Sequence, residues 1–357
     1  MTPDEARRVP KVLLHDHLDG GLRVDTIREL ADHIGHDLPA DDPDELAAWF
    51  RAGADTGDIL QYLATFAHTV PLLQTADALE RVAAEAAADL AADGVVHAEV
   101  RFAPELHAGP GDDTGLGSLD EAIEAVAAGF ARGSAEAGTI QVDTIVCAMR
   151  TEGRSADVAE AAVRWLGRGV VAFDLAGAET GFPPSDHTDA LDIAHRGLAA
   201  VTIHASERPG LELIADALRL GAQRIGHGVL LIEDCTVDGD GDLVLGSLAR
   251  YVRDRRIPLE LCPSCNVQIG AVPTIADHPV GPFLRAGIVA TVNTDNRLMS
   301  GVSVSSELGL VADTFDLSWD EVRQLQRNAA AATFADHDRR SALLAQIDAG
   351  FASLVAG

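Results

Sequence analysis

Residues 10–21, which read PKVLLHDHLDGG, indicate both the fold and the chemistry of this chain. If the apolar run is a strand, the alternation of side chains places His15, His17 and Asp19 on one face. Two imidazoles and a carboxylate that converge in this way are ligands suited to a zinc-like divalent metal. A lone His-x-His pair is more often an ordinary surface or core feature, so its meaning depends on what later segments supply.

Strand-like runs alternate along the chain with Ala- and Leu-rich segments of helical spacing. The pattern predicts strands at Lys11–His15, Gly94–Arg101, Gln141–Ala148, Gly169–Leu175, Ala200–His204, Arg224–Gly226, Ile257–Leu261 and Gly287–Asn293. It predicts helices at Thr75–Ala92, Ser118–Ala137, Ser155–Leu166, Asp186–Ala199, Leu211–Leu220, Gly246–Arg255 and Pro279–Ala286. Repeated β-α units favour one α/β domain over residues 1–357, a (β/α)8 TIM barrel. A doubly wound open sheet is the alternative, although it normally shows a Gly-rich fingerprint after its first strand.

Two insertions interrupt this repeat. Extra helices are expected after the first strand, over Val24–Ala92, and the apolar residues of Asp58–Phe66 either cap a pocket or pack as an ordinary helix. The second insertion, Asp238–Asp242, superficially resembles a calcium loop. Leu243 stands where that loop needs Gly and Ala249 where it needs Glu, so a hairpin turn is predicted instead.

The composition excludes several classes of protein. The chain has 357 residues, of which 47% are apolar, and 56 acidic against 27 basic residues give a net charge of −29. This balance argues against a nucleic-acid or anionic-membrane surface. No long apolar stretch is present, so we expect neither a signal peptide nor a membrane span, and the four cysteines are too few for a dense disulfide framework. We therefore expect a cytoplasmic protein, monomeric or homodimeric.

Polar residues recur at the ends of later predicted strands. His204 ends the fifth, His227 follows the sixth, and Asp295 follows the eighth. Strand C-termini of a barrel converge on one mouth, where His15, His17, His204 and Asp295 would meet around one metal. Three neutral imidazoles and one carboxylate, with a position left for water, are typical of a catalytic site.

Taken together, these segments resemble the adenosine deaminase family of the metal-dependent amidohydrolases over nearly the whole chain. The resemblance is carried by Pro10–Gly21, Phe173–Glu179, His204–Glu207, Arg224–Gly228, Cys262–Asn266 and Asn293–Asn296. It implies one zinc ion per chain, bound by His15, His17, His204 and Asp295, and a purine nucleoside as substrate. It also implies a catalytic role for Glu207 as proton donor, for His227 in positioning water, and for Asp295 as an acceptor from that water. His17, Asp19 and Gly177 would meet the nucleoside.

Two positions depart from the family pattern. Ser206 stands where Gly is usual, so its side chain can strain a backbone geometry that Gly tolerates and can crowd the purine edge. Asn296 stands where Asp is usual, and its amide NH₂ can donate to purine N7, which is an acceptor. Both departures bear on substrate identity more than on metal binding.

Other interpretations stay open at this stage. His97-x-Glu99 and Cys262-x-x-Cys265 imitate the signature of cytidine and tRNA-adenosine deaminases, but His97 lies within a predicted strand instead of at a helix start. Cys265 is interpreted as a packing or pocket-rim residue. The main prediction is hydrolytic deamination of adenosine and 2′-deoxyadenosine. The alternatives are a modified adenine nucleoside, such as aminofutalosine or an N6- or 5′-substituted analogue, and a catalytically silent barrel that binds a nucleoside or metal.

Overall fold

Eight parallel strands form the centre of the molecule. The computed structural model describes residues 1–108, 116–206 and 210–355. The strands are β1 Lys11–His17, β2 Val95–Phe102, β3 Gln141–Met149, β4 Val170–Ala176, β5 Ala200–Ala205, β6 Arg224–His227, β9 Leu259–Leu261 and β10 Ala290–Val292. They pair in the order β1-β2-β3-β4-β5-β6-β9-β10, so every strand of the sheet predicted from the sequence is confirmed within a few residues. Their side chains are almost all buried, as expected for parallel strands covered by helices.

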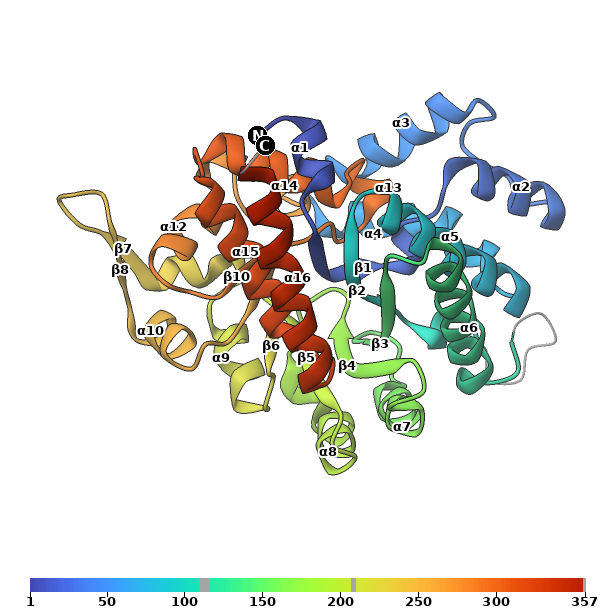
Figure 1. The fold of residues 1–357 in the computed structure, drawn as a ribbon. Helices are drawn as coiled ribbons and strands as arrows, with labels where there is room; N and C mark the ends of the chain where they lie inside the picture. The colour runs from blue at the N-terminus through green and yellow to red at the C-terminus, as the bar shows by residue number, and fades with distance from the viewer. Residues whose placement is uncertain (109–115, 207–209, 356–357) are drawn as a thin grey trace.

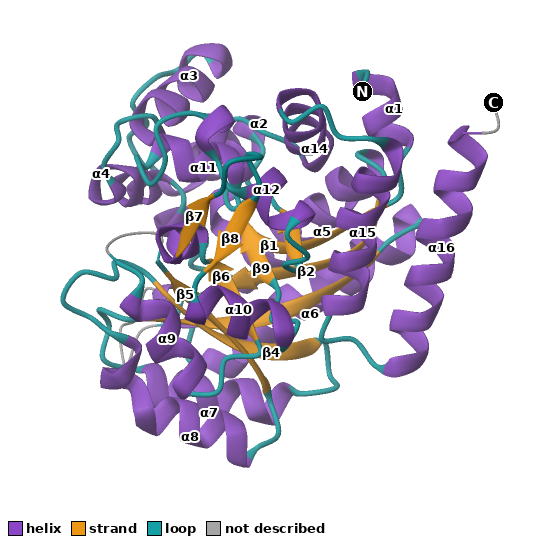
Figure 2. Ribbon diagram, turned by 90° about the vertical axis from the view of Figure 1, so that its left-hand side faces the viewer, coloured by secondary structure: helices purple, strands orange, loops and turns teal. Residues whose placement is uncertain are grey.

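Helices surround this sheet on its outer side (Figures 1 and 2). They are α5 Ala76–Ala92, α6 Leu119–Ala137, α7 Ser155–Trp165, α8 Thr188–Arg196, α9 Glu212–Arg219, α10 Ser247–Asp254, α12 Val280–Arg285, α14 Val304–Thr314, α15 Trp319–Ala332 and α16 His337–Val355. Three short helices, α1 Pro3–Arg8, α11 Pro263–Gln268 and α13 Arg297–Ser300, lie outside this set. The arrangement is the (β/α)8 TIM barrel expected from the sequence.

Local sequence signals set the helix ends and their packing. The side chain of Thr75 caps α5 by accepting from Ala78 N, and Gly138 ends α6 at φ 69°. Helices α5 and α6 approach closely because α6 carries Gly133, where an added Cβ would lie 2.4 Å from Ala84 O. This tight contact explains the small residues of both helices.

The insertion after β1 folds into helices α2 Val24–Ile34, α3 Pro43–Ala54 and α4 Ile59–Ala64, followed by 3-10 turns at Thr65–His68 and Val70–Leu72. These helices lie together beside the barrel, in the blue part of Figure 1. The second insertion forms the predicted hairpin, in which β7 Cys235–Val237 pairs antiparallel with β8 Leu243–Leu245. The hairpin projects from the body of the protein (Figure 1).

The junction between β10 and β1 is short and nearly closes the barrel. His17 N donates to Asp295 O at 2.7 Å, and Asp295 N donates to His15 O at 3.0 Å. Earlier in β1, a side chain takes the place of a backbone–backbone hydrogen bond, because Leu14 N donates to Asn293 Oδ1 at 3.0 Å. Asn293 Nδ2 donates in turn to Leu261 O and Thr291 Oγ1. Asn293 thus acts as a buried bridge between the first and last strands.

None of the described helices combines the length and apolarity that crossing a bilayer requires.

Replacement of Asn293 by Leu tests this closure. The variant leaves the buried Leu14 N–H without its acceptor, and an unmet buried donor costs about 1–3 kcal/mol. We expect urea denaturation to show a free energy of unfolding lower by at least about 2 kcal/mol, because Leu261 O and Thr291 Oγ1 also lose a donor. Gln141→Ala, at the exposed start of β3, is the control and should change it little. Equal stability of the two variants would contradict the bridging role.

Candidate active site

A cavity of about 430 Å³ opens at the carboxyl ends of the strands. This volume lies within the range of about 300–1,000 Å³ that is usual for small-molecule sites. One wall is apolar and comes from the insertion, with Ile59, Tyr62, Leu63 and Phe66 among its lining residues. The interpretation of Asp58–Phe66 as a pocket cap is therefore confirmed.

The rest of the lining includes most of the residues singled out in the sequence. These lining residues are His17, Asp19, Gly177, His204, His227, Asp295 and Asn296. His15 lies beneath them and is fully buried. Glu207 falls outside the described residues, so the structure does not test its predicted role.

Close contacts join the four expected metal ligands. Asp295 Oδ1 lies 3.4 Å from His15 Nε2 and 3.4 Å from His17 Nε2. His17 Nε2 lies 3.3 Å from His204 Nε2. His15 Nε2 is buried and has no hydrogen-bond partner among the described residues. Three ring nitrogens and one carboxylate directed at a common space form a donor set that suits a divalent metal.

Buried carboxylates contact the Nδ1 atoms of two of these histidines. Glu260 Oε2 accepts from His15 Nδ1 at 2.9 Å, and Asp174 Oδ2 lies 3.1 Å from His204 Nδ1. Because a carboxylate only accepts, each ring carries its proton on Nδ1 and keeps the lone pair of Nε2 for the site. This is the usual second layer of a metal centre, and it supports metal binding by these two rings.

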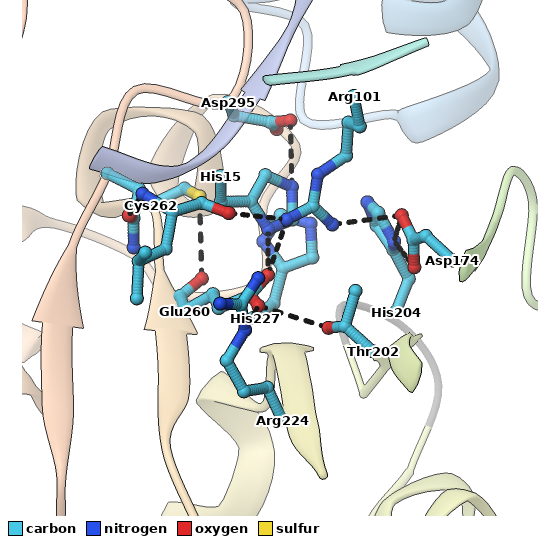
Figure 3. A network of polar contacts seen from close by, with 12 residues as sticks. His15, Arg101, Asp174, Thr202, His204, Arg224, His227, Glu260, Cys262 and Asp295 are labelled. Carbon is cyan, nitrogen blue, oxygen red and sulfur yellow. Dashed lines mark hydrogen bonds and ion pairs between the residues drawn. The ribbon is translucent and has the colours of Figure 1, made fainter. Parts of the chain in front are cut away.

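One arginine holds both of those carboxylates. Arg101 Nη2 donates to Glu260 Oε2 at 2.7 Å, and Arg101 Nη1 donates to Asp174 Oδ2 at 2.9 Å (Figure 3). Arg224 Nε donates to the other oxygen of Glu260 at 2.5 Å. Complete burial acts to raise the pKa of Asp174, but His204 and Arg101 outweigh it and lower that pKa. No role was predicted for these residues from the sequence, where their one signal is a charged residue inside each apolar strand.

Burial also sets the protonation of the ligands. It lowers the pKa of both His15 and His17 well below the usual histidine value, so both rings are neutral and able to bind a cation. Burial raises the pKa of Asp19 to about 7 and raises that of Asp295. Neutral imidazoles lie beside carboxyl groups whose charged form is disfavoured by burial. This arrangement favours a positive ion in the space between them.

Two further side chains lie close enough to compete for a metal. The ring nitrogens of His15, His204 and His227 lie within 4.8 Å of one another, as do ligand atoms of His15, Cys262 and Asp295. Cys262 is buried, and its place next to the site was not predicted from the sequence, in which it belongs to the Cys-x-x-Cys pattern and to one of the segments that resemble the family. Cys265 is buried as well, in keeping with the expected packing role.

The structure shows the surroundings of Ser206 and Asn296, the two residues that depart from the family pattern. Ser206 has φ 60°, the left-handed conformation that favours Gly, as its position suggested. Its hydroxyl donates to Gly210 O at 2.5 Å, and Ser206 is not among the described residues that line the cavity. The hydroxyl is therefore engaged in a hydrogen bond to Gly210, and the structure gives no support to crowding of a purine edge.

Asn296 lines the cavity and packs on Gly20, where a Cβ would lie 1.8 Å from Asn296 Oδ1.

Comparison with known proteins places this chain in a family. The family model described as adenosine deaminase matches residues 10–350. The chain is 51% identical over 350 residues to an adenosine deaminase of Mycobacterium sp. (strain KMS), covering 96% of this chain and 95% of that protein. It is 50% identical over 360 residues to adenosine deaminase 1 of Streptomyces coelicolor, covering 99% and 90% of the two chains. Among solved structures, an adenine deaminase from Arthrobacter aurescens matches with a TM-score of 0.82 and 26% identity, covering 95% and 98% of the two chains.

Asp174→Asn tests the second layer of this centre. The amide removes the charge that faces His204 Nδ1 and that pairs with Arg101, and loss of such a partner typically weakens metal binding by about 10–100-fold. Competition with a chromogenic chelator measures the metal affinity. Asp143→Asn is the matched control, because Asp143 lies 3.9 Å from His97, away from the cavity lining. If the two variants bind metal equally well, Asp174 does not support the centre.

Proposed function

This chain belongs to the adenosine deaminase family, and we propose that it hydrolyses adenosine and 2′-deoxyadenosine to inosine and 2′-deoxyinosine with release of ammonia. The observation that carries the proposal is the convergence of His15, His17, His204 and Asp295 at one end of the barrel, beside a cavity with an apolar wall. A cavity with one apolar wall and polar residues elsewhere in its lining suits a flat heterocycle joined to a sugar. We propose that residues 1–357 act as one catalytic domain.

Zinc is the metal that we propose for this centre. Imidazole and carboxylate ligands suit it, and the buried Nε2 of His15, which has no hydrogen-bond partner among the described residues, fits a ligand atom. When bound, zinc supplies the Lewis acidity that makes a water molecule nucleophilic near neutral pH. The neutral state of His15 and His17 keeps their lone pairs available without competition from protons.

The remaining steps fall to side chains of the chain. Asp295, next to the ligand histidines, accepts a hydrogen bond from the attacking water and directs it at C6 of the purine. Glu207 gives a proton to N1 as the electron pair of the C6–N1 double bond shifts onto N1, and His227 donates to the oxygen at C6 as its negative charge grows. Asp295 takes one proton from the attacking water and passes it to the amino group, so the C6–N bond breaks with release of ammonia. The remaining proton of the water returns to Glu207 as the C6–O double bond of the product forms.

Substrate positioning is proposed for the polar rim. Asp19 lines the cavity with a buried oxygen, Oδ1, that has no hydrogen-bond partner among the described residues, and it would meet the ribose together with His17. Gly177, at φ 92°, brings its backbone to the cavity and would approach the purine where a side chain would obstruct. Asn296 would donate its amide NH₂ to N7.

An ammonia-release assay on a small panel tests this function. We expect turnover of adenosine and 2′-deoxyadenosine that exceeds turnover of adenine and of adenosine 5′-monophosphate. Elemental analysis should find about one zinc per chain, the number expected for one set of ligands. His204→Ala should lose both the metal and the activity. Full activity in rigorously metal-free protein would overturn the proposal.

Glu207→Gln tests the proposed acid. The amide keeps the size of the side chain but cannot give a proton to N1, and a general acid typically contributes about 10²–10⁴-fold. We expect kcat to fall within that range, while the thermal unfolding midpoint and the zinc content stay unchanged. Glu212→Gln, at an exposed position of α9, is the control and should behave as the unmodified protein. A normal kcat for Glu207→Gln would assign proton transfer to another group.

A further inference from the structure

A chain of hydrogen bonds leads from the backbone of α12 to the ring of His227. Val280 N donates to His278 Nδ1 at 3.1 Å. A backbone N–H is always a donor, so Nδ1 of His278 is an acceptor and the proton of this neutral ring is on Nε2. His278 is 1% exposed, and burial lowers its pKa to about 3, which keeps the ring neutral. The tautomer of His278 is therefore set by a backbone N–H, which can only donate.

The next link is the side-chain amide of Asn266. His278 Nε2 lies 3.2 Å from Asn266 Oδ1 and donates to it. Cys262 N is a second obligate donor to the same oxygen, at 3.3 Å. Two donors on one side of the amide fix which end is oxygen, so the NH₂ group of Asn266 must face the other way. That NH₂ group lies 3.1 Å from His227 Nδ1.

His227 is the last member of the chain. Because Asn266 Nδ2 donates to its Nδ1, the proton of the neutral imidazole is on Nε2. His15 and His204 have the opposite arrangement, since the carboxylates of Glu260 and Asp174 hold protons on their Nδ1 atoms. The three rings lie close together, with centroids 4.6 Å apart for His15 and His204 and 4.7 Å apart for His15 and His227. They thus differ in which nitrogen carries the proton.

We propose that His278 is a positioning residue that acts through Asn266 to hold the proton of His227 on Nε2. A ring that carries its proton on Nε2 cannot bind a metal through that atom, and it presents a hydrogen-bond donor instead. This separates His227 from the neighbouring metal ligands and makes it a donor to the oxygen at C6. The catalytic consequence rests on the proposed function, whereas the tautomer of His227 does not.

Nuclear magnetic resonance tests the tautomer directly. Long-range ¹H–¹⁵N correlation spectra of the zinc-loaded, ¹⁵N-labelled protein distinguish the protonated nitrogen of each ring, and single-histidine variants supply the assignments. We expect His227 and His278 with the proton on Nε2, and His15 and His204 with the proton on Nδ1. A proton on Nδ1 of neutral His227 in the unmodified enzyme would overturn the proposal, whatever the substrate proves to be.

Variants of the two intermediaries test cause and effect. Asn266→Asp presents an oxygen to His227 in place of the NH₂ group, and the same spectra should then show a proton on Nδ1. His278→Gln keeps a donor toward Asn266, whereas His278→Leu removes it. We expect His278→Leu to lower kcat by about tenfold, corresponding to the loss of one hydrogen bond, with KM and zinc content unchanged. His278→Gln should restore most of kcat.

A matched control separates positioning from general loss of stability. His195 Nε2 lies 2.9 Å from Leu220 O, on the outer layer of the barrel, so His195→Leu removes a hydrogen-bonded histidine outside the chain that reaches His227. We expect normal kcat from this variant. Equal kcat values for His278→Leu and His278→Gln, or an unchanged His227 tautomer in Asn266→Asp, would contradict the role of His278.

Discussion

The site depends on the pairing of one buried guanidinium with two buried carboxylates. Arg101, fully buried, binds both Glu260 and Asp174, and each of these carboxylates orients one histidine of the metal centre. Burying charges in the interior of a barrel is unfavourable unless each charge has partners of good geometry. Here Glu260 and Asp174 also fix the proton positions of His15 and His204 respectively (Figure 3). The charged interior of the barrel and the chemistry at its mouth are therefore a single hydrogen-bonded structure.

Backbone strain is present at the same end of the barrel. His227, the last residue of β6, and Asp295, three residues beyond β10, both have φ 58°, a conformation that is uncommon for residues other than Gly. In each case the chain turns sharply at the strand end, and the side chain lines the cavity instead of continuing the alternation of the strand. Such conformations persist only where surrounding contacts determine them, and they cluster at functional sites. For Asp295, the two backbone hydrogen bonds with β1 supply that constraint.

The sequence predicts much of this arrangement because its main signals are local. Apolar runs mark the strands, and the polar residues that end them, such as His204, identify the mouth of the barrel. The role of Glu207 was instead implied by the family resemblance, and this residue lies outside the described residues. Partners that are distant in sequence could not be predicted: Asn293 closes the barrel and His278 reaches His227 through contacts that only the tertiary structure reveals. The hydrogen bond of the Ser206 hydroxyl to Gly210 O was likewise not predicted from the sequence.

Proton position, more than charge, distinguishes the histidines of this site. The ring centroids of His15, His204 and His227 lie between 4.6 and 5.2 Å apart, so protonating all three rings would place like charges next to one another in a buried space. Neutral rings avoid that repulsion, and each then has one donor and one acceptor nitrogen. The partner at Nδ1 of each ring decides whether Nε2 of that ring carries a lone pair or a proton. Carboxylates behind two rings and an amide behind the third are therefore sufficient to make neighbouring, identical side chains perform different tasks.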